Sequence, residues 1–596
     1  MGAQGALLDR ATATLLVTIA TPIAIVVLLG NAALLTPQAV LVATGALAAV
    51  GWTLAGARAR AATLRDAAAF ASVLRLALFG GTWSLAAWTG LVAALIAAIA
   101  AWLLPPWAWD ALGYHLPLVH DALLTERLRV VPTHIPYVNV YPHLADLYVV
   151  WFRASLPDDT WIELAQLPFA ALAVLASAAI AARAGVRTGR ALGLSLTFLS
   201  LPAVALQLAA NYVDIAYAAL LVAAIAFLFA RRLTTSNALL GALSLGLLLG
   251  TKPSAPVPFA LIVAAMVAHG RALRRPAWIA ALAALIGGAT YLDNLVRHGN
   301  PVWPVQMKIG PIELPGLSPA SYFFDLGLSE PVRSYGWAGR LITSLYQWPA
   351  RAVYDMRLGG FGPLVGWVLL PLALVFVLRR RAPLARVRVG LLVLAAVSLA
   401  TPAAFWTRYT LAFAAALLAI FAVGSETISP PLRRASELVV AGAAALGLWI
   451  ALPGFTDHRV SLIELLRLRT ADERAARFGG IDGHESAWIA ARTQAAPGEA
   501  IAYDRSLGLP GRLWDGRGAT RVVYVGDLDT RGVADALLRE RVRIAALGAD
   551  TAEQLALAGV QLEALFACRD DGCTVYRLKD ERLARAPRGA PAGVQR

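Results

Sequence analysis

The sequence is poor in charged residues, and this scarcity indicates its class. Only 15% of the 596 residues are Asp, Glu, Lys or Arg, and 59% are hydrophobic. A typical soluble protein has about 25% charged residues. Apolar runs of about 20 residues, the length that crosses a bilayer, recur along most of the chain. These features exclude an ordinary soluble globular protein and predict a polytopic α-helical membrane protein.

Other features are absent, and each absence excludes a class of function. There is no Gly-x-Gly-x-x-Gly phosphate loop, which disfavours a nucleotide-binding domain. There is no convincing internal repeat with paired broken helices, as expected of many secondary transporters. No cleavable signal pattern is visible at the N-terminus. The net charge of +15 does not indicate nucleic-acid binding, because most basic residues lie in short loops between apolar runs or in the tail.

Thirteen apolar runs are long enough to be read as spanning helices. We expect them at roughly 14–35, 39–57, 82–104, 160–182, 191–209, 214–230, 236–250, 255–270, 277–296, 361–378, 389–405, 409–424 and 436–453.

The basic residues of the short loops predict the orientation. Cytoplasmic loops of membrane proteins are enriched in Lys and Arg. If the N-terminus is cytoplasmic, the inner segments hold 20 arginines, whereas the short outer connections hold only Lys252 and Arg408. We therefore expect thirteen crossings that begin inside and end outside.

Two long outer loops and a C-terminal domain complete the predicted organisation. We expect a two-span extension at 1–80 and a transmembrane core at 81–454 with outer loops at 105–159 and 297–360. Segments 117–128 and 142–156 have the pattern of amphipathic helices that lie along the membrane face. The aromatic, Pro- and Gly-rich second loop suits a wall or lid over a cavity.

Residues 455–580 alternate predicted strands and helices, which indicates a small extracytoplasmic α/β domain. No phosphate loop is visible in it, so we interpret it as an accessory domain. The two cysteines, Cys568 and Cys573, flank a turn-like sequence. An oxidising outer compartment favours a disulfide between them. Residues 581–596 are expected to be a disordered tail.

The stretch from Trp107 to Asp121 follows the third apolar run and concentrates polar groups. It contains Asp110, Tyr114 and His115. A carboxylate where a helix leaves the bilayer is costly unless water or a partner receives it, so Asp110 is a candidate site residue. The alternative is an interfacial loop in which Asp110 is a helix N-cap.

Further polar residues fall at the outer ends of other helices. They are Asn211 and Asp214, then Lys252, then Arg408 and Tyr409. A carboxylate can act as a general base, and Arg suits a phosphate through its bidentate fork. Alternatively, the two cations snorkel to headgroups and Asp214 is an N-cap. Four of the eight His lie in the first outer loop, but their spacing matches no zinc pattern, so we expect no metal ligands there.

The motif from Trp109 to Pro117 (Trp-Asp-Ala-Leu-Gly-Tyr-His-Leu-Pro) resembles the Asp-x-x-x-Tyr-His-x-Pro signature of uncharacterised bacterial members of the GT-C glycosyltransferase superfamily. The stretches at 141–146, 300–304 and 408–409 also resemble such proteins, and the likeness covers about residues 80–450. In that superfamily a catalytic Asp or Glu lies in the first large outer loop. The resemblance implies this role for Asp110. Two spans precede the helix before Asp110, and no adjacent acidic pair follows it, both of which depart from the pattern.

Together these features predict an inverting glycosyltransferase that uses a polyprenyl-phosphate-linked sugar at the outer face of the membrane. Asp110 would be the general base, and Arg408, with Lys252, would hold the donor phosphate. Tyr114, His115, Asn211, Asp214 and Tyr409 would shape the substrate site. We expect the lipid-linked donor and membrane lipid as partners, and no nucleic acid. We expect no organic cofactor, and the sequence leaves open whether a divalent metal is used. The alternatives are a transporter or flippase of lipid-linked saccharides and a non-catalytic scaffold for envelope assembly.

Overall fold

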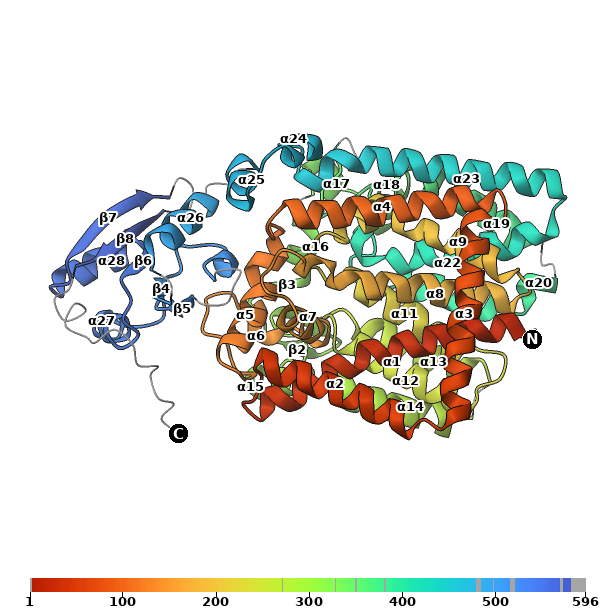
Figure 1. The fold of residues 1–596 in the computed structure, drawn as a ribbon, viewed down its shortest axis with the longest axis horizontal. Helices are drawn as coiled ribbons and strands as arrows, with labels where there is room; N and C mark the ends of the chain where they lie inside the picture. The colour runs from red at the N-terminus through yellow and green to blue at the C-terminus, as the bar shows by residue number, and fades with distance from the viewer. Residues whose placement is uncertain are drawn as a thin grey trace.

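A computed structural model describes residues 3–579, apart from 271, 327, 349–350, 380–381, 479–483, 497, 515–519 and 569–571. Helices running along the long axis of the molecule form its body (Figure 1). A domain with a five-stranded sheet lies at one end of this body, and the N-terminus lies at the other. The chain is therefore a polytopic helical membrane protein with a small C-terminal α/β domain, as the sequence predicts.

Each of the thirteen predicted apolar runs is helical. Five of the helices described are long and apolar enough to cross a membrane, or six if a bent pair counts as one span. The remaining apolar helices have 10–17 residues, so thirteen complete crossings remain a prediction. In chain order the helices of the body are α1 (Ala3–Asn31), α2 (Pro37–Leu54), α4 (Trp83–Leu103), η2 (Ile162–Gln166), α8 (Leu167–Arg183), α9 (Thr188–Leu196), η3 (Thr197–Ser200), α10 (Pro202–Gln207), α11 (Asp214–Leu228), α12 (Thr235–Leu249), α13 (Pro256–Ala268), α14 (Arg274–Gly287), α15 (Ala289–His298), η4 (Leu364–Leu369), α19 (Leu370–Leu378), α21 (Arg388–Leu399), α22 (Leu411–Gly424) and α23 (Pro430–Ala451).

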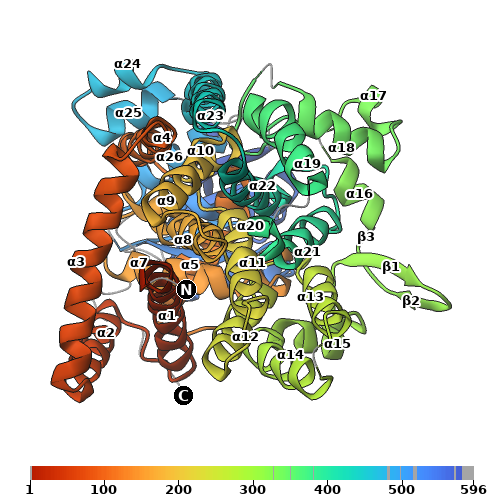
Figure 2. The same cartoon turned by 90° about the vertical axis from the view of Figure 1, so that its right-hand side faces the viewer.

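The centre of the body is packed from helices with small residues. α8, α11 and α22 are buried over most of their length, and Figure 2 shows them near the middle of the bundle. Small side chains let helix backbones approach closely in membranes. A Cβ on Gly90 of α4 would lie 2.0 Å from the carbonyl oxygen of Leu196, so this crossing needs glycine.

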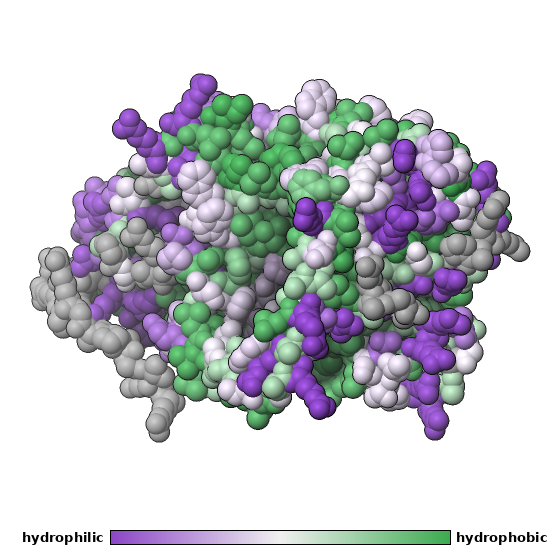
Figure 3. Space-filling view, turned by 45° about the vertical axis from the view of Figure 1, so that its right-hand side comes forward, coloured by the Kyte–Doolittle hydropathy of each residue, from purple (hydrophilic) through white to green (hydrophobic). Residues whose placement is uncertain are grey.

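The outer helices show why the body needs lipid. α2 is apolar, yet only 6% of its spanning window is buried. Its exposed side chains include Leu41, Val42, Leu47 and Trp52. Exposed apolar surface of this extent marks contact with a membrane or a partner. Figure 3 shows hydrophobic residues spread over the flank of the body.

One helix is absent from the sequence-based prediction. α3 (Ala57–Phe79) forms where a cytoplasmic loop is expected, and it runs crosswise to the spanning helices along one side of the bundle (Figures 1 and 2). Its buried residues are Val73 and Ala77, which face the bundle. It contains four arginines and has low hydropathy, so it is not recognised as an apolar run.

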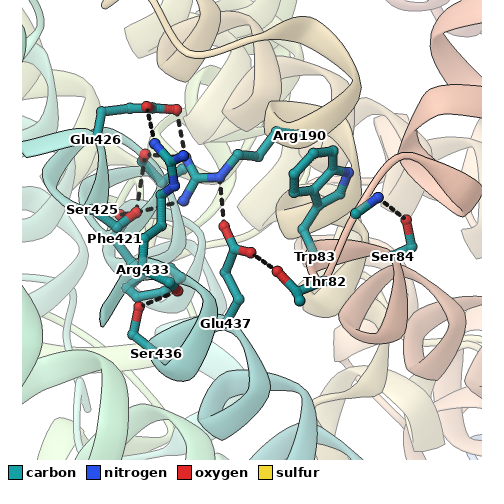
Figure 4. Close-up of polar contacts among 12 residues, drawn as sticks. Thr82, Trp83, Ser84, Arg190, Phe421, Ser425, Glu426, Arg433, Ser436 and Glu437 are labelled. Atoms are coloured by element: carbon teal, nitrogen blue, oxygen red, sulfur yellow. Dashed lines mark hydrogen bonds and ion pairs between the residues drawn. The ribbon is translucent and has the colours of Figure 1, made fainter. Parts of the chain in front are cut away.

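A buried ionic cluster joins α9, α22 and α23 at the end away from the sheet domain (Figure 4). Arg190 donates to Glu437 at 2.6 Å, to Glu426 at 2.8 Å and to Ser425 at 2.6 Å. Thr82, which precedes α4, donates to the other oxygen of Glu437. The Arg190 and Glu437 side chains are 2% and 1% exposed. Every charge of this cluster is thus paired, as burial requires.

The C-terminal domain has the order of strands β5-β4-β6-β8-β7. β4 (Ala500–Tyr503) pairs in parallel with β5 (Arg521–Tyr524) and with β6 (Ile544–Gly548), and β8 (Cys573–Leu578) is antiparallel to β6 and β7 (Leu562–Ala567). The helices are α24 (Leu462–Leu466), α25 (Ala471–Phe478), α26 (His484–Gln494), α27 (Thr530–Arg539) and α28 (Ala549–Leu557), with the short η8 (Pro510–Arg512). This agrees with the predicted alternation. The disulfide between Cys568 and Cys573 is formed, as predicted. The tail predicted at 581–596 lies outside the described residues.

The outer loops are more ordered than the sequence indicates. The first contains the π-helix η1 (Ala111–His115), α5 (Leu116–Leu124), α6 (Tyr137–Val140) and α7 (Leu144–Ala154). Most of α5 is buried, so its predicted place on an open membrane face is wrong, because the C-terminal domain packs on this loop. The second holds a small sheet and short helices: β1 (Val305–Ile309), β2 (Ile312–Leu314), β3 (Ser318–Pro319), α16 (Ala320–Asp325), α17 (Glu330–Arg333) and α18 (Trp337–Tyr346).

The ionic cluster predicts a large stability effect at Arg190. Arg190→Met leaves the carboxylate of Glu437 buried without its cation, which should destabilise the fold by about 3–5 kcal/mol. The matched control is Arg433→Met, because Arg433 pairs with Glu426 while its side chain is 30% exposed. That change should cost less than about 1 kcal/mol. Thermal unfolding of the full chain in detergent measures both, and equal melting temperatures for the two variants would contradict the assignment.

Candidate functional site

A cavity lies at the outer loops, where several helices end toward the C-terminal domain. It is small, at about 50 Å³. Seven of the eight predicted site residues line it, and they come from four separate regions of the chain. The lining residues are Asp110, Tyr114, His115, Tyr141, Pro142, Asp146, Tyr212, Val213, Asp214, Thr251, Lys252, Pro253, Arg408 and Tyr409.

Asp110 is held just before η1. Pro117 has no N–H, which removes one bond that a regular helical turn would use, and the turn from Ala111 to His115 widens into a π-helix. Such π-turns are frequent at functional sites. Asp110 forms no side-chain N-cap bond, so the N-cap interpretation does not hold. Its carboxylate instead accepts from Arg408 Nη1 at 2.8 Å.

Arg408 lies in the 3-10 turn η5 (Thr407–Tyr409) and meets three carboxylates. Its Nη1 is 2.8 Å from Asp110 and 3.6 Å from Asp214, and its Nε is 3.1 Å from Asp355. The guanidinium also lies 5.0 Å from the ring centre of Tyr212, within cation–π range. The side chain is 7% exposed. Arg408 is therefore paired within the protein and does not snorkel to headgroups.

The turn that carries Arg408 is fixed by its neighbour. Thr407 is fully buried. Its hydroxyl accepts from the backbone N–H of Gly360 at 3.1 Å and lies 3.0 Å from the hydroxyl of Ser344. Such bonds hold a buried hydroxyl in one rotamer. They therefore fix the backbone that carries the side chain of Arg408.

Lys252 and Asp214 form the second ion pair of the cavity. Lys252 Nζ bonds to Asp214 Oδ1, and it lies 3.3 Å from the centre of the Tyr409 ring. Gln207 donates to the other oxygen of Asp214 at 3.2 Å. Asp214 opens α11 but does not cap it, since the cap position is Val213. Neither the N-cap nor the snorkelling interpretation describes this pair.

His115 and His143 share one carboxylate. Each Nδ1 lies 2.7 Å from an oxygen of Asp146. Burial alone would raise the pKa of Asp146, but its pairing with the two imidazoles holds the pKa below the usual value. The Nε2 atoms of both imidazoles are buried and have no hydrogen-bond partner among the described residues. His115 therefore offers a free ring nitrogen at the wall of the cavity.

Two tyrosines complete this wall. Burial raises the pKa of Tyr114 and of Tyr141 above the ordinary value, so both phenols stay protonated at neutral pH. Their rings meet edge to face, with centroids 5.6 Å apart. Protonated phenols can donate hydrogen bonds to the oxygens of a bound molecule.

Asn211 is the predicted site residue that does not line the cavity. Its side chain is buried, and neither amide atom has a partner among the residues described. Two residues of the ion-pair network, Asp355 and Arg357, are not among the predicted site residues. Asp355 lies 3.1 Å from Arg408 and 3.0 Å from Arg357. The only signal was an acid and a base two positions apart in an aromatic loop.

The histidines of the first outer loop do not gather around a common centre. His115 and His143 bind Asp146, His120 lies 3.3 Å from Asp159, and His134 packs on Tyr503 and Tyr524 of the C-terminal domain. No group of three or more His, Cys, Asp or Glu arranged to hold a metal occurs in the described parts of the chain.

The C-terminal domain touches the segment that carries Asp110. A Cβ on Gly511 of η8 would lie 2.5 Å from the carbonyl oxygen of Leu112 in η1. The ring of His120 in α5 stacks on Trp514, with centroids 6.2 Å apart. These contacts make the domain part of the support of the cavity wall.

The ion-pair network around Arg408 has as many cations as acids. Arg408, Lys252 and Arg357 are its cations, and Asp110, Asp214 and Asp355 are its acids. Asp146, which also lines the cavity, is held by His115 and His143 instead. An acid and a fork-shaped cation side by side can accept a proton and bind an oxyanion, respectively. The arrangement therefore fits transfer chemistry on an anionic, phosphate-bearing molecule.

No family model matches this sequence, and no curated protein matches it. Solved structures do show a distant likeness. ArnT from Cupriavidus metallidurans aligns with a TM-score of 0.48 and 14% identity in the apo state, covering 84% of this chain and 98% of that one. ArnT bound to undecaprenyl phosphate aligns with a TM-score of 0.48 and 15% identity, covering 82% of this chain and 97% of that one.

The archaeal oligosaccharyltransferase AglB from Archaeoglobus fulgidus, in complex with an inhibitory peptide and a dolichol-phosphate, gives a TM-score of 0.39 and 12% identity, covering 77% of this chain and 69% of that one. These alignments describe a likeness of overall arrangement alone.

The contact between η8 and η1 predicts an effect of Gly511→Val. The added side chain cannot fit against Leu112 without moving one of the two turns, and such overpacking typically costs about 1–3 kcal/mol. We expect the variant to lose full-length chain faster under limited proteolysis. Leu557→Ala, at an exposed position of α28 in the same domain, is the matched control. Cleavage of Gly511→Val at the rate of this control would show that the two turns are not in contact.

Proposed function

We propose that this chain is a membrane glycosyltransferase. It transfers a sugar, with inversion, from a polyprenyl-phosphate-linked donor to an acceptor hydroxyl at the outer face of a bacterial inner membrane. The observation that supports this most is the 2.8 Å ion pair between Asp110 and Arg408 in the cavity wall. It puts a base and a phosphate-binding cation at one point, at the end of an apolar bundle that a lipid tail can reach.

The reaction needs one proton acceptor. The acceptor hydroxyl attacks the anomeric carbon of the donor, and its proton moves to Asp110. The new bond joins the acceptor oxygen to the sugar, and the bond from the sugar to the phosphate oxygen breaks. The electron pair of that bond leaves with the polyprenyl phosphate, which needs no protonation. Attack from the side opposite the leaving group inverts the anomeric centre.

Arg408 holds the leaving phosphate. Its planar guanidinium can offer two parallel N–H donors to a phosphate, which the ammonium of a Lys cannot. In the structure these donors face Asp110, Asp214 and Asp355. A phosphate that binds here replaces at least one carboxylate, and the displaced Asp110 is then free to accept a proton.

The remaining residues shape the substrate site. Lys252 lies beside the acids and adds a second cation for the phosphate. Tyr114 and the free Nε2 of His115 can hydrogen bond to sugar hydroxyls. A cavity of about 50 Å³ holds no more than a few water molecules. Donor binding therefore has to widen it.

The orientation is part of this proposal. The basic inner segments place the N-terminus in the cytoplasm, and the cavity and the C-terminal domain then lie outside. The disulfide between Cys568 and Cys573 supports this placement, because disulfides persist in oxidising compartments.

The test is single-turnover transfer of a labelled sugar. The purified full chain is mixed with synthetic polyprenyl-phosphate sugars of several kinds and with an extract of envelope acceptors. Release of polyprenyl phosphate together with label in a new product supports the proposal. Movement of an intact donor across a vesicle membrane, without bond breaking in any donor of the panel, would overturn it in favour of a transporter.

Arg408→Lys should remain folded and lose most of the transfer rate. Lys keeps the positive charge but presents no planar fork, so the phosphate loses one of two parallel bonds. We expect a loss of about 10-fold or more, the size of one charge-assisted hydrogen bond. Arg340→Lys is the matched control, because Arg340 also pairs with an acid, Asp325, in an outer loop away from the cavity. Equal turnover by the two variants would remove Arg408 from the phosphate site.

Asp110→Asn removes the base and keeps the shape of the side chain. A general base contributes about 10²–10⁴-fold, so the single-turnover rate should fall in that range while the donor still binds. The matched control is Asp121→Asn, because Asp121 is a buried Asp of the same loop that pairs with Arg129 at 2.7 Å. If Asp110→Asn retains the parent rate in a chain of unchanged melting temperature, the base lies elsewhere, with Asp214 the next candidate.

A further inference from the structure

A second and larger cavity lies at the end of the bundle opposite the C-terminal domain. Its volume is about 110 Å³. It opens where α8 and α11 end and α21 begins, and Figure 2 shows these helices close together in the view onto this end. Three arginines, Arg183, Arg231 and Arg386, line it, and we call it the arginine pocket. The other lining residues are Ile180, Ile225, Ala226, Phe229, Val387 and Gly390.

The arginines of this pocket differ in the ion pairs and hydrogen bonds that they form. Arg183 forms an ion pair with Asp9 at 2.7 Å and donates to the carbonyl of Ala226. Arg386 makes one long hydrogen bond of 3.4 Å to the carbonyl of Ala184. Arg231 is exposed and has no ion pair with any residue that the structure describes. Among the residues that the structure describes, no acid lines the pocket, so two guanidinium groups face it without a carboxylate.

The positive-inside rule accounts for arginines in this region but not for their arrangement. That rule needs basic residues anywhere in short inner loops. Here they come from three connections that are distant in sequence, and they rim one cavity whose floor is apolar. Arg232 and Arg379 lie in the same connections and do not line the cavity. Convergence of this kind indicates a ligand with a negative head.

The chemistry of the pocket fits a phosphate. The guanidinium fork matches phosphate oxygens, and basic pockets between membrane helices bind anionic headgroups. The apolar part of the ligand also has a place. Val389 and Leu392 of α21 are 39% and 41% exposed, and they adjoin Gly390 in the pocket floor. A lipid with its phosphate between the arginines can lay its acyl chains along this face of α21.

We propose that the arginine pocket binds the phosphate group of an anionic membrane lipid. This site is separate from the cavity at Asp110 and does not depend on the function proposed for that cavity. Arg231 and Arg386 supply guanidinium groups that have no carboxylate partner among the described residues, Arg183 forms the inner wall, and Ile225 and Phe229 contact the glycerol end of the lipid.

The test measures lipid binding to the purified full chain in a non-ionic detergent, by native mass spectrometry. Phosphatidylglycerol should bind more tightly than phosphatidylcholine. The double variant Arg231→Gln, Arg386→Gln should weaken phosphatidylglycerol binding roughly 10- to 30-fold, as expected for two arginines near a headgroup. The matched control, Arg232→Gln with Arg379→Gln, removes the same charge outside the pocket and should bind as the parent does.

Two outcomes would overturn the proposal. An equal loss in the control and in the pocket variant would show that diffuse surface charge attracts the lipid. Binding of inorganic phosphate through the same two arginines, with no gain from acyl chains, would show that the ligand is a free phosphate and not a lipid. If the double variant does not fold, the single change Arg231→Gln serves, since this exposed side chain supports no described ion pair, and unchanged phosphatidylglycerol binding by a folded single variant counts against the proposal.

Discussion

The half of the molecule next to the C-terminal domain depends on the pairing of Arg408. Its guanidinium is nearly buried, and a buried charge without a partner costs several kcal/mol. The three acids that satisfy it lie before η1, at the start of α11 and in the segment that follows α18. These segments are far apart in the sequence, so the same interaction that closes the outer ends of the helices also assembles the cavity. Here the fold and the site have a common cause.

The opposite end of the bundle uses the same device for a different purpose. Arg190 donates hydrogen bonds to two glutamates, a serine and a backbone carbonyl. Between the two ends the helices pack through alanine and glycine. These small side chains allow close contact but do not fix how far one helix is shifted along another. Ion pairs at both ends therefore fix how the helices are aligned along their axes. The outer cluster differs in that it borders a cavity.

The sequence predicted the local features of this fold and missed the long-range ones. Apolar runs, the C-terminal strands and the disulfide depend on neighbouring residues, and these predictions agree with the structure. The pairing of Asp110 with Arg408 joins residues 298 positions apart, and no local pattern encodes it. Asp355 was missed for that reason, and α3 because it is not apolar. Asn211 was included only because it adjoins Asp214 in the sequence.

The balanced charge of the ion-pair network around Arg408 constrains how a phosphate can bind. Three cations of this network already face three acids, so an incoming phosphate adds negative charge to a neutral group of side chains. It can bind tightly only if a carboxylate gives up its cation. Asp110 is the most exposed of the three acids that line the cavity, with its side chain at 15% against 1% for Asp214 and 2% for Asp146, and it can turn toward water at the least cost. In the function proposed above, binding of the donor and release of the base are then one event, and the base is free only when a donor is present.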